Sequence, residues 1–168
     1  MAYHSHFSRT DDLIEHLNKV VPPVENPLLQ LQYVGFVSVT AVAVYELAIK
    51  TIFVDFSKQK HHIFGNFVES YFDRLNGRIR VQDIVDDKIT KFGKKYVDRF
   101  QEKLKKREAD FRKENKRDCK SAYENIIHCR NHFAHGNLSG VNGTYQEVVQ
   151  AYRDGKEVIH TLDETMRL

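Results

Sequence analysis

Residues 118–137 read DCKSAYENIIHCRNHFAHGN, and their spacing predicts an amphipathic helix. Apolar residues recur every three or four positions, which places them along one helix face. The stripe consists of Cys119, Ala122, Tyr123, Ile126, Arg130 and Phe133. Because a buried guanidinium loses its water, Arg130 requires an anion, a ligand or a partner chain on that face. Gly136 is typical of a helix C-terminus, so His135 is expected in the last turn.

The opposite face of this helix is polar and carries Glu124, Asn125, His128, His132 and His135. His128 and His132 are four residues apart and share a face, as zinc ligands often do, but no third ligand beyond His135 accompanies them. Two interpretations of Arg130 and His135 remain open. They are either catalytic groups, or a buried ion-pair member and a helix-end cation that offsets the helix dipole.

The segment Arg130-Asn131-His132-Phe133-Ala134-His135 resembles the signature of the HEPN superfamily (higher eukaryotes and prokaryotes nucleotide-binding). That signature is an Arg, commonly followed by Asn, Asp or His, with four to six residues before a His. The resemblance implies an all-helical, metal-independent endoribonuclease that acts on RNA as a homodimer and needs no cofactor. It also implies that Arg130 and His135 are catalytic, with Asn131 as a polar helper.

A bacterial stress or defence role, as a toxin or an antiviral effector, is a further implication of this resemblance. An antitoxin or another regulatory protein is then a potential partner. In one toxin branch of the superfamily, a Tyr two residues after the His is modified by a partner nucleotidyltransferase. Asn137 occupies that position here, so this form of regulation is not expected. The alternative is a non-catalytic HEPN-like module that binds a nucleotide, an RNA or a protein.

The two motif residues suit metal-free RNA cleavage. A His, with a pKa near 6.5, can take or give a proton at neutral pH, and an Arg supplies forked donors and permanent charge to a phosphate. Attack by the ribose 2′-hydroxyl would leave 2′,3′-cyclic phosphate and 5′-hydroxyl ends. Five residues along a helix turn about 500°, so the side chains of Arg130 and His135 diverge by roughly 140°. Two-fold pairing of the motif helices, or a helix that loosens over residues 134–136, would let both side chains reach one phosphate. The HEPN resemblance implies the first, so we expect a composite site in the groove of a homodimer.

Residues 28–56 form a long, nearly continuous apolar segment, which Asn26-Pro27 opens as cap and first helical residue. Three interpretations compete: a membrane span, buried strands over residues 37–44, and the central helix of a bundle. Polar side chains argue against the membrane span, and they are Gln30, Gln32, Ser38, Thr40, Glu46 and Lys50. We favour the central helix and expect no membrane partner.

Glu46 is the acidic residue within this apolar segment. It can pair with Lys50 one turn later, which contributes little to stability. It can instead reach Arg130 and hold the guanidinium in orientation, in which case it supports the site. Both interpretations remain open from the sequence.

The composition is that of an ordinary soluble protein and predicts a single domain over residues 1–168. With only 3 Pro and 8 Gly in 168 residues, helices are favoured over a turn-rich β-sandwich. Cys119 and Cys129 lie ten residues apart on one predicted helix, about 15 Å along its axis and beyond disulfide reach. Free thiols and a polar, non-signal-like Met1 to Arg9 segment predict a cytoplasmic protein.

Positive charge is concentrated just before the motif. Residues 103–120 contain 9 Lys or Arg against 4 Asp or Glu, more positive charge than the +3 of the whole chain. Most such runs are solvated helix faces. The functional interpretation is a phosphate-binding surface leading into the motif. Its candidate RNA-binding residues are Arg112, Lys113, Lys116, Arg117 and Lys120.

The rest of the chain also has helical patterns. We expect a helix capped by Thr10 and ending near Val20, a short one over 64–75, a turn at 76–77, a long one over 83–111, and a last one opened by a Thr144–Glu147 capping box. The predicted fold class is therefore all-α. It is a HEPN-like bundle of about five to six helices around a long central apolar helix.

Overall fold

The computed structural model describes residues 3–22, 24–73, 78–137, 140 and 143–167, and within these ranges helices are the only regular secondary structure. The α-helices are α1 (His4–Val20), α2 (Pro27–Lys60), α3 (His62–Phe72), α4 (Val81–Asp83), α5 (Lys94–Asn115), α6 (Cys119–Ala134) and α7 (Tyr145–Met166). A π-helical segment, η1 (Ile84–Lys88), and a 3-10 turn, η2 (Ile89–Phe92), connect α4 to α5. The all-α prediction is confirmed, with seven α-helices in the described ranges rather than five or six.

Helix α2 is the centre of the bundle and contacts α1, α3, α6 and α7. Asn26 caps it, accepting hydrogen bonds from the Leu28 and Leu29 backbone at 2.9 and 3.3 Å. The central-helix prediction is confirmed, and strands over residues 37–44 are excluded. By length and composition α2 is apolar enough to cross a membrane, but 61% of its most apolar window is buried inside the bundle. That burial is consistent with the core helix of a soluble protein.

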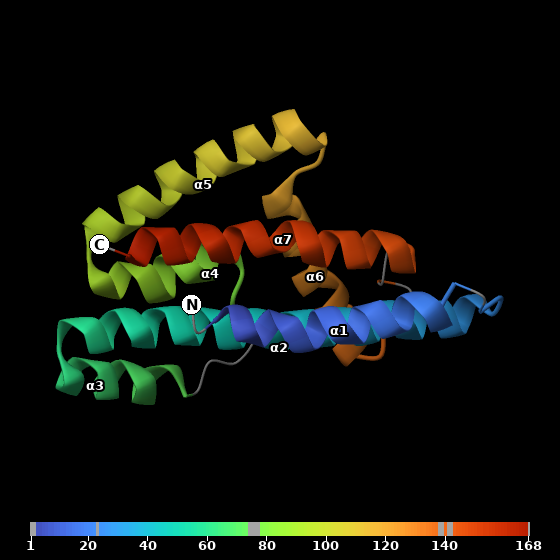
Figure 1. Ribbon diagram of the computed structural model, residues 1–168, viewed down its shortest axis with the longest axis horizontal. Coiled ribbons are helices and arrows are strands. Elements are labelled where there is room, and N and C mark those ends of the chain that lie inside the picture. The colour runs from blue at the N-terminus through green and yellow to red at the C-terminus, as the bar shows by residue number, and fades with distance from the viewer. Residues whose placement is uncertain (1–2, 23, 74–77, 138–139, 141–142, 168) are drawn as a thin grey trace.

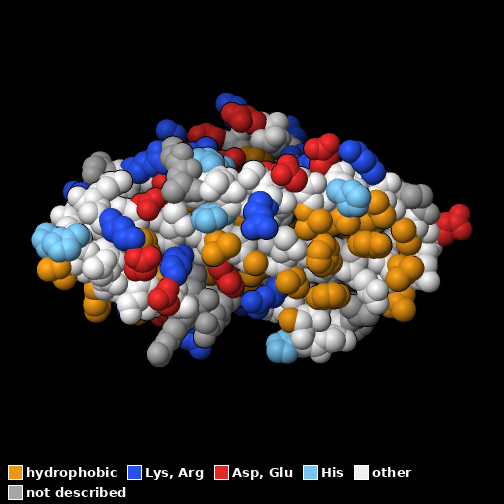
Figure 2. Space-filling view, turned by 60° about the horizontal axis from the view of Figure 1, so that its bottom comes forward, with side chains coloured by type: hydrophobic (Ala, Val, Ile, Leu, Met, Phe, Trp, Pro, Cys, Tyr) orange, Lys and Arg blue, Asp and Glu red, His pale blue; other side chains and the backbone are white. Residues whose placement is uncertain are grey.

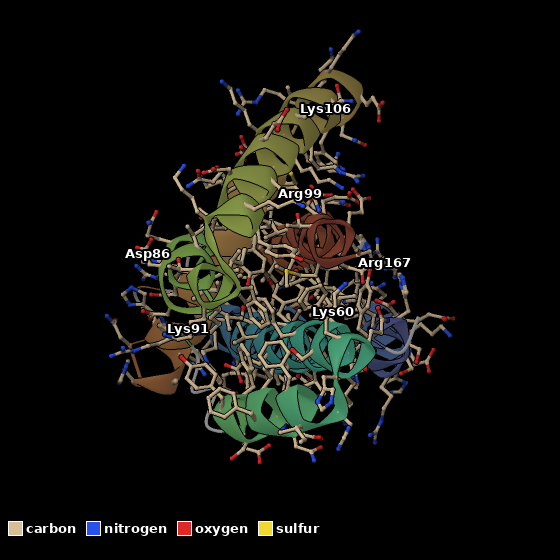
Figure 3. All side chains as sticks on the ribbon, turned by 90° about the vertical axis from the view of Figure 1, so that its left-hand side faces the viewer. Lys60, Asp86, Lys91, Arg99, Lys106 and Arg167 are labelled. Atoms are coloured by element: carbon tan, nitrogen blue, oxygen red, sulfur yellow. The ribbon has the colours of Figure 1, made fainter. Side chains whose placement is uncertain are left out.

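Figure 1 shows α1, α2 and α7 running alongside one another, while α6 passes steeply behind them. The C-terminal end of α5 and the start of α6 lie at the top of this view, and α6 ends below α2. Figure 3, along the bundle, shows side chains filling the space between the helices, with Asp86, Lys91 and Lys106 directed outward. One buried hydrophobic cluster spans these helices.

Buried tyrosines fix α6 between α2 and α7. The Tyr45 hydroxyl donates to the Tyr152 carbonyl, and the Tyr123 hydroxyl donates to the Ile79 carbonyl, both at 2.6 Å. Gly155 of α7 allows the close approach, because a Cβ there would lie 3.1 Å from the Tyr123 Cα. The two hydrogen bonds satisfy hydroxyls that burial would otherwise leave unpaired. The Tyr45 and Tyr123 rings also stack, with centroids 5.0 Å apart, and so join α2 to α6.

Two helix predictions were wrong at their boundaries. α1 begins at His4, and Thr10 is buried inside it rather than capping it, because Tyr3 and Phe7 also pack into the core. The helix expected over 83–111 is interrupted by η1, η2 and Gly93, whose φ of 104° is left-handed. α3 ends at Phe72, and the predicted turn at 76–77 lies outside the described residues.

His160 makes the contact between α1 and α7 sensitive to acid. The Tyr3 hydroxyl lies 2.9 Å from His160 Nδ1. The His4 ring stacks on the His160 ring, with centroids 5.4 Å apart. Burial, followed by the nearby His4, Arg107 and Lys156, lowers the pKa of His160 from 6.5 to about 4. The folded protein therefore keeps this imidazole neutral at pH values where an exposed histidine would be protonated.

We expect stability to fall as the pH drops from 6.5 towards 4. In that window the unfolded chain protonates His160 and the folded protein does not, so the free energy of unfolding decreases by as much as about 3 kcal/mol. Urea unfolding at a series of pH values measures this, and His160→Gln should show a much shallower dependence. Equal pH dependence in both proteins would contradict the assignment to His160.

Candidate functional site

Helix α6 begins at a capping residue that is itself held in place. Asp118 accepts a hydrogen bond from the Ser121 backbone at 2.8 Å, and the Arg112 guanidinium pairs with the same carboxylate. A carboxylate at this end also interacts favourably with the positive pole of the helix dipole. The start of α6 is therefore tied to the end of α5.

The other end of α6 closes in a Schellman motif. The Gly136 and Asn137 backbone amides donate to the Phe133 and His132 carbonyls at 3.0 and 2.9 Å, and Gly136 has a left-handed φ of 70°. Gly136 is thus the helix terminator, as predicted. His135 is the C-cap, with φ −92° and ψ 10°, one residue beyond the expected last turn. It is exposed, and its imidazole makes no hydrogen bond within the part of the chain that the structure describes.

Arg130 packs against α2 and meets Glu46 there. Its Nη2 lies 3.6 Å from Glu46 Oε1, with 30% of the arginine side chain and 22% of the glutamate side chain exposed. Its Nη1 donates to Asn131 Oδ1 at 3.0 Å. The structure therefore brings together Arg130, Asn131 and Glu46, three of the residues singled out from the sequence. The guanidinium is oriented from two sides while part of it faces solvent.

Phe133 determines where along α2 the motif packs. It packs against the core over Gly35, where a Cβ would lie only 1.9 Å from the aromatic ring. A glycine in mid-helix costs roughly 1 kcal/mol relative to alanine. The close approach of α6 to α2 explains why the sequence tolerates it at this position.

We expect Gly35→Ala to destabilise the protein by about 1–3 kcal/mol, because overpacking against Phe133 outweighs the gain in helix propensity. Chemical unfolding measures the change. Phe133→Ala removes the ring, so Gly35→Ala added to that variant should be neutral or stabilising. A loss of equal size in both backgrounds would mean that the clash with Phe133 is not the cause.

The basic run divides into paired and unpaired residues. Arg117 Nε and Nη2 bind Asp154 Oδ2 and Oδ1 at 2.6 and 3.2 Å, and Arg112 pairs with Asp118. These two arginines therefore hold the α5–α6 connection. The other three predicted RNA-binding residues, Lys113, Lys116 and Lys120, are exposed and have no ion pair in the described residues.

These basic residues lie at the opposite end of α6 from the motif (Figure 1). The 15 residues from Lys120 to His135 correspond to about 22 Å along a helix axis. A strand that touches both ends must therefore run along α6. Whether the five predicted residues bind RNA stays a prediction.

An open cavity of about 710 Å³ lies between α6 and α7. It is lined by Arg80, Glu124, Asn125, Ile126, His128, Cys129, Gly143, Glu147, Val148 and Ala151. The His128 ring also contacts the His132 ring, with centroids 4.3 Å apart. Among the described residues, no group of three or more His, Cys, Asp or Glu side chains is arranged to hold a metal ion.

Sequence reasoning missed Arg80 and the α7 side of this cavity. Arg80 precedes α4 and lies 39 residues before the start of α6, so no local pattern connects them. The signal that was visible is the polar face of α6, which includes Asn125 and His128. A polar face on an otherwise buried helix indicates solvent or a ligand.

A protein-family model described as RiboL-PSP-HEPN matches residues 5–167. No curated protein and no solved structure matches the chain. The match extends over all the described helices after the first residue of α1, so it covers the motif and the bundle around it together.

Proposed function

The chain belongs to the RiboL-PSP-HEPN family, and on that premise we propose that it is a metal-independent endoribonuclease. The observation that carries the proposal is the state of the motif at the end of α6. Glu46 and Asn131 orient the half-buried guanidinium of Arg130, and five residues later the His135 imidazole is exposed. A fixed cation and an accessible acid–base group are what metal-free phosphodiester cleavage requires.

In the proposed reaction the ribose 2′-oxygen attacks the adjacent phosphorus. A bond forms between them, the bond from phosphorus to the 5′-oxygen breaks, and a 2′,3′-cyclic phosphate remains. His135 takes the proton of the 2′-hydroxyl and, once protonated, can return one to the departing 5′-oxygen. Arg130 donates to the phosphate oxygens as negative charge builds up on them.

Glu46 and Asn131 act through Arg130 in this proposal. The Arg130–Glu46 separation of 3.6 Å is a looser ion pair than a bidentate clamp, which leaves guanidinium donors for a phosphate. Asn131 accepts from Nη1 and so fixes the plane of the guanidinium. Both are positioning residues.

The site is proposed to be composite, with two copies of the chain facing each other. Along the outer face of α2, the side chains of Leu28, Phe36, Val39 and Leu47 are 53%, 45%, 39% and 49% exposed. Figure 2 shows hydrophobic side chains gathered on the right-hand half of the face it presents, at the end of the bundle where α2 begins. This outer α2 stripe (Leu28, Phe36, Val39, Leu47) adjoins the α2 positions that contact α6. A second copy seated on it would cover the stripe and bring two motifs together.

We place this activity in the cytoplasm, as a single-domain toxin or defence effector controlled by an antitoxin or another regulatory protein. The buried free thiols of Cys119 and Cys129 suit a reducing compartment. A non-catalytic nucleotide-, RNA- or protein-binding module is the second candidate. Its support is the Arg130–Glu46 contact within one protomer, which also gives the arginine a structural role.

The deciding experiment is incubation of the purified protein with total RNA in the presence of EDTA. We expect fragments with 2′,3′-cyclic phosphate and 5′-hydroxyl ends, which a kinase-dependent end-labelling assay detects. Cleavage that requires a divalent metal would exclude the proposed mechanism. RNA binding without any cleavage would favour the non-catalytic module.

A further inference from the structure

We propose that the cavity between α6 and α7 binds an unpaired nucleotide of the RNA, close to the phosphate that is cleaved. The inference rests on the proposed function and adds a subsite to it. The cavity volume of about 710 Å³ lies within the usual range of small-molecule pockets. It is open to solvent along the polar face of α6, so a strand on that face can place a base in it.

The cavity and the proposed acid–base group share one face of α6. Asn125, His128, His132 and His135 follow one another at intervals of three or four residues, which aligns them along the helix. From His128 to His135 the axis rises about 10 Å. That length corresponds to about three nucleotides at the roughly 3.4 Å rise of a stacked strand.

The polar groups of the cavity leave cationic and amide donors available. Glu124 already accepts from the Val81 backbone at 2.8 Å, and Glu147 accepts from the Thr144 backbone at 2.6 Å. The side chains of Arg80, Asn125 and His128, by contrast, make no hydrogen bond or ion pair within the described ranges 78–137 and 143–167. The acids of the cavity are thus engaged by backbone amides, and the free donors can meet a phosphate or a base edge.

The remaining walls suit the flat face of a base. Ile126, Val148 and Ala151 supply apolar surface, and the His128 ring, which contacts the His132 ring beside the cavity, adds an aromatic surface. Bases stack on aromatic side chains and on guanidinium planes, and they reach such a site only when unpaired. The combination therefore favours single-stranded RNA over a duplex.

Lys120 supplies a positive charge on the side of the cavity away from His135. Lys120 is exposed near the N-terminal end of α6, four residues before Glu124 and on the same helix face. A single strand that follows this face passes Lys120, then the cavity, and ends at His135. The 22 Å gap between the basic end and the motif is bridged by the proposed subsite.

Binding is tested in a protein that does not cleave. The probe is a fluorescein-labelled ten-nucleotide single-stranded RNA of mixed sequence, added to the His135→Ala variant and followed by fluorescence anisotropy. Adding Arg80→Ala and His128→Ala should raise the Kd about tenfold or more. Lys95→Ala removes one exposed positive charge from α5, away from the cavity, and should change the Kd less than about twofold.

Kinetics separate this subsite from the nuclease proposal. In the protein with His135 intact, Arg80→Ala and His128→Ala should raise KM and alter the pattern of cleaved sequences, with kcat largely kept. Unchanged Kd and KM, or an equal effect of Lys95→Ala, would overturn the subsite while leaving the nuclease standing. A wild-type protein that never cleaves RNA would overturn the nuclease, and the anisotropy measurement would still decide whether the cavity binds RNA.

Discussion

Replacing His135 by alanine should lower the rate of RNA cleavage by at least about a hundredfold, the usual contribution of a positioned acid–base group. His135 is the imidazole at the C-cap of α6, and an alanine in its place cannot exchange protons. Because His135 is exposed and makes no side-chain hydrogen bond in the described residues, the substitution should leave the urea midpoint unchanged. Cleavage of a labelled RNA in EDTA, with circular dichroism beside it, measures both quantities.

His62→Ala is the matched control, because it removes another exposed imidazole at the start of α3. That variant should cleave like the wild type. If His135→Ala keeps full activity, the acid–base role of His135 is wrong and the cleavage must depend on other groups. If it loses activity and also unfolds at lower urea, the residue has a structural role in closing α6.

The sequence was sufficient where structure is decided locally. Asn26 before Pro27, and Thr144 before Glu147, form the predicted caps, because a cap needs only groups within one helical turn. The apolar 28–56 segment was predictable as the central helix for a similar reason. Its length and lack of a polar face leave few places for it other than the middle of a bundle.

The sequence was insufficient where contacts between residues far apart in the chain decide the structure. Gly93 interrupts the long pattern because η1 and η2 redirect the chain, and apolar spacing does not register such a bend. Arg117 was interpretable only as a surface cation until α7 placed Asp154 beside it. Glu46 shows the intermediate case: its oddity in an apolar segment marked it as a partner for Arg130, but only packing could choose between that arginine and Lys50.

Replacing Phe36 by glutamate should convert the proposed dimer to a monomer and reduce cleavage at least about tenfold. Phe36 is 45% exposed in the outer α2 stripe, where a charge facing a second copy would be desolvated without a partner. Phe67→Glu is the matched control: Phe67 of α3 is 68% exposed but lies outside the stripe. Sedimentation equilibrium should show dissociation for the first variant alone. Dissociation of the Phe67→Glu variant alone would place the interface at α3. A monomeric wild-type protein would contradict the proposed dimer.

Mixing two inactive variants tests whether the site itself is shared. If Arg130 of one protomer works with His135 of the other, each heterodimer of Arg130→Ala and His135→Ala protomers retains one intact site. Half of a random mixture is heterodimeric with one of two sites intact, so about a quarter of the wild-type activity should return. If both groups act within a single chain, every site in the mixture lacks one of them and activity stays at the level of the separate variants. Recovery of activity on mixing would therefore show that Arg130 and His135, which an ideal helix separates by roughly 140°, meet across the dimer rather than within one chain.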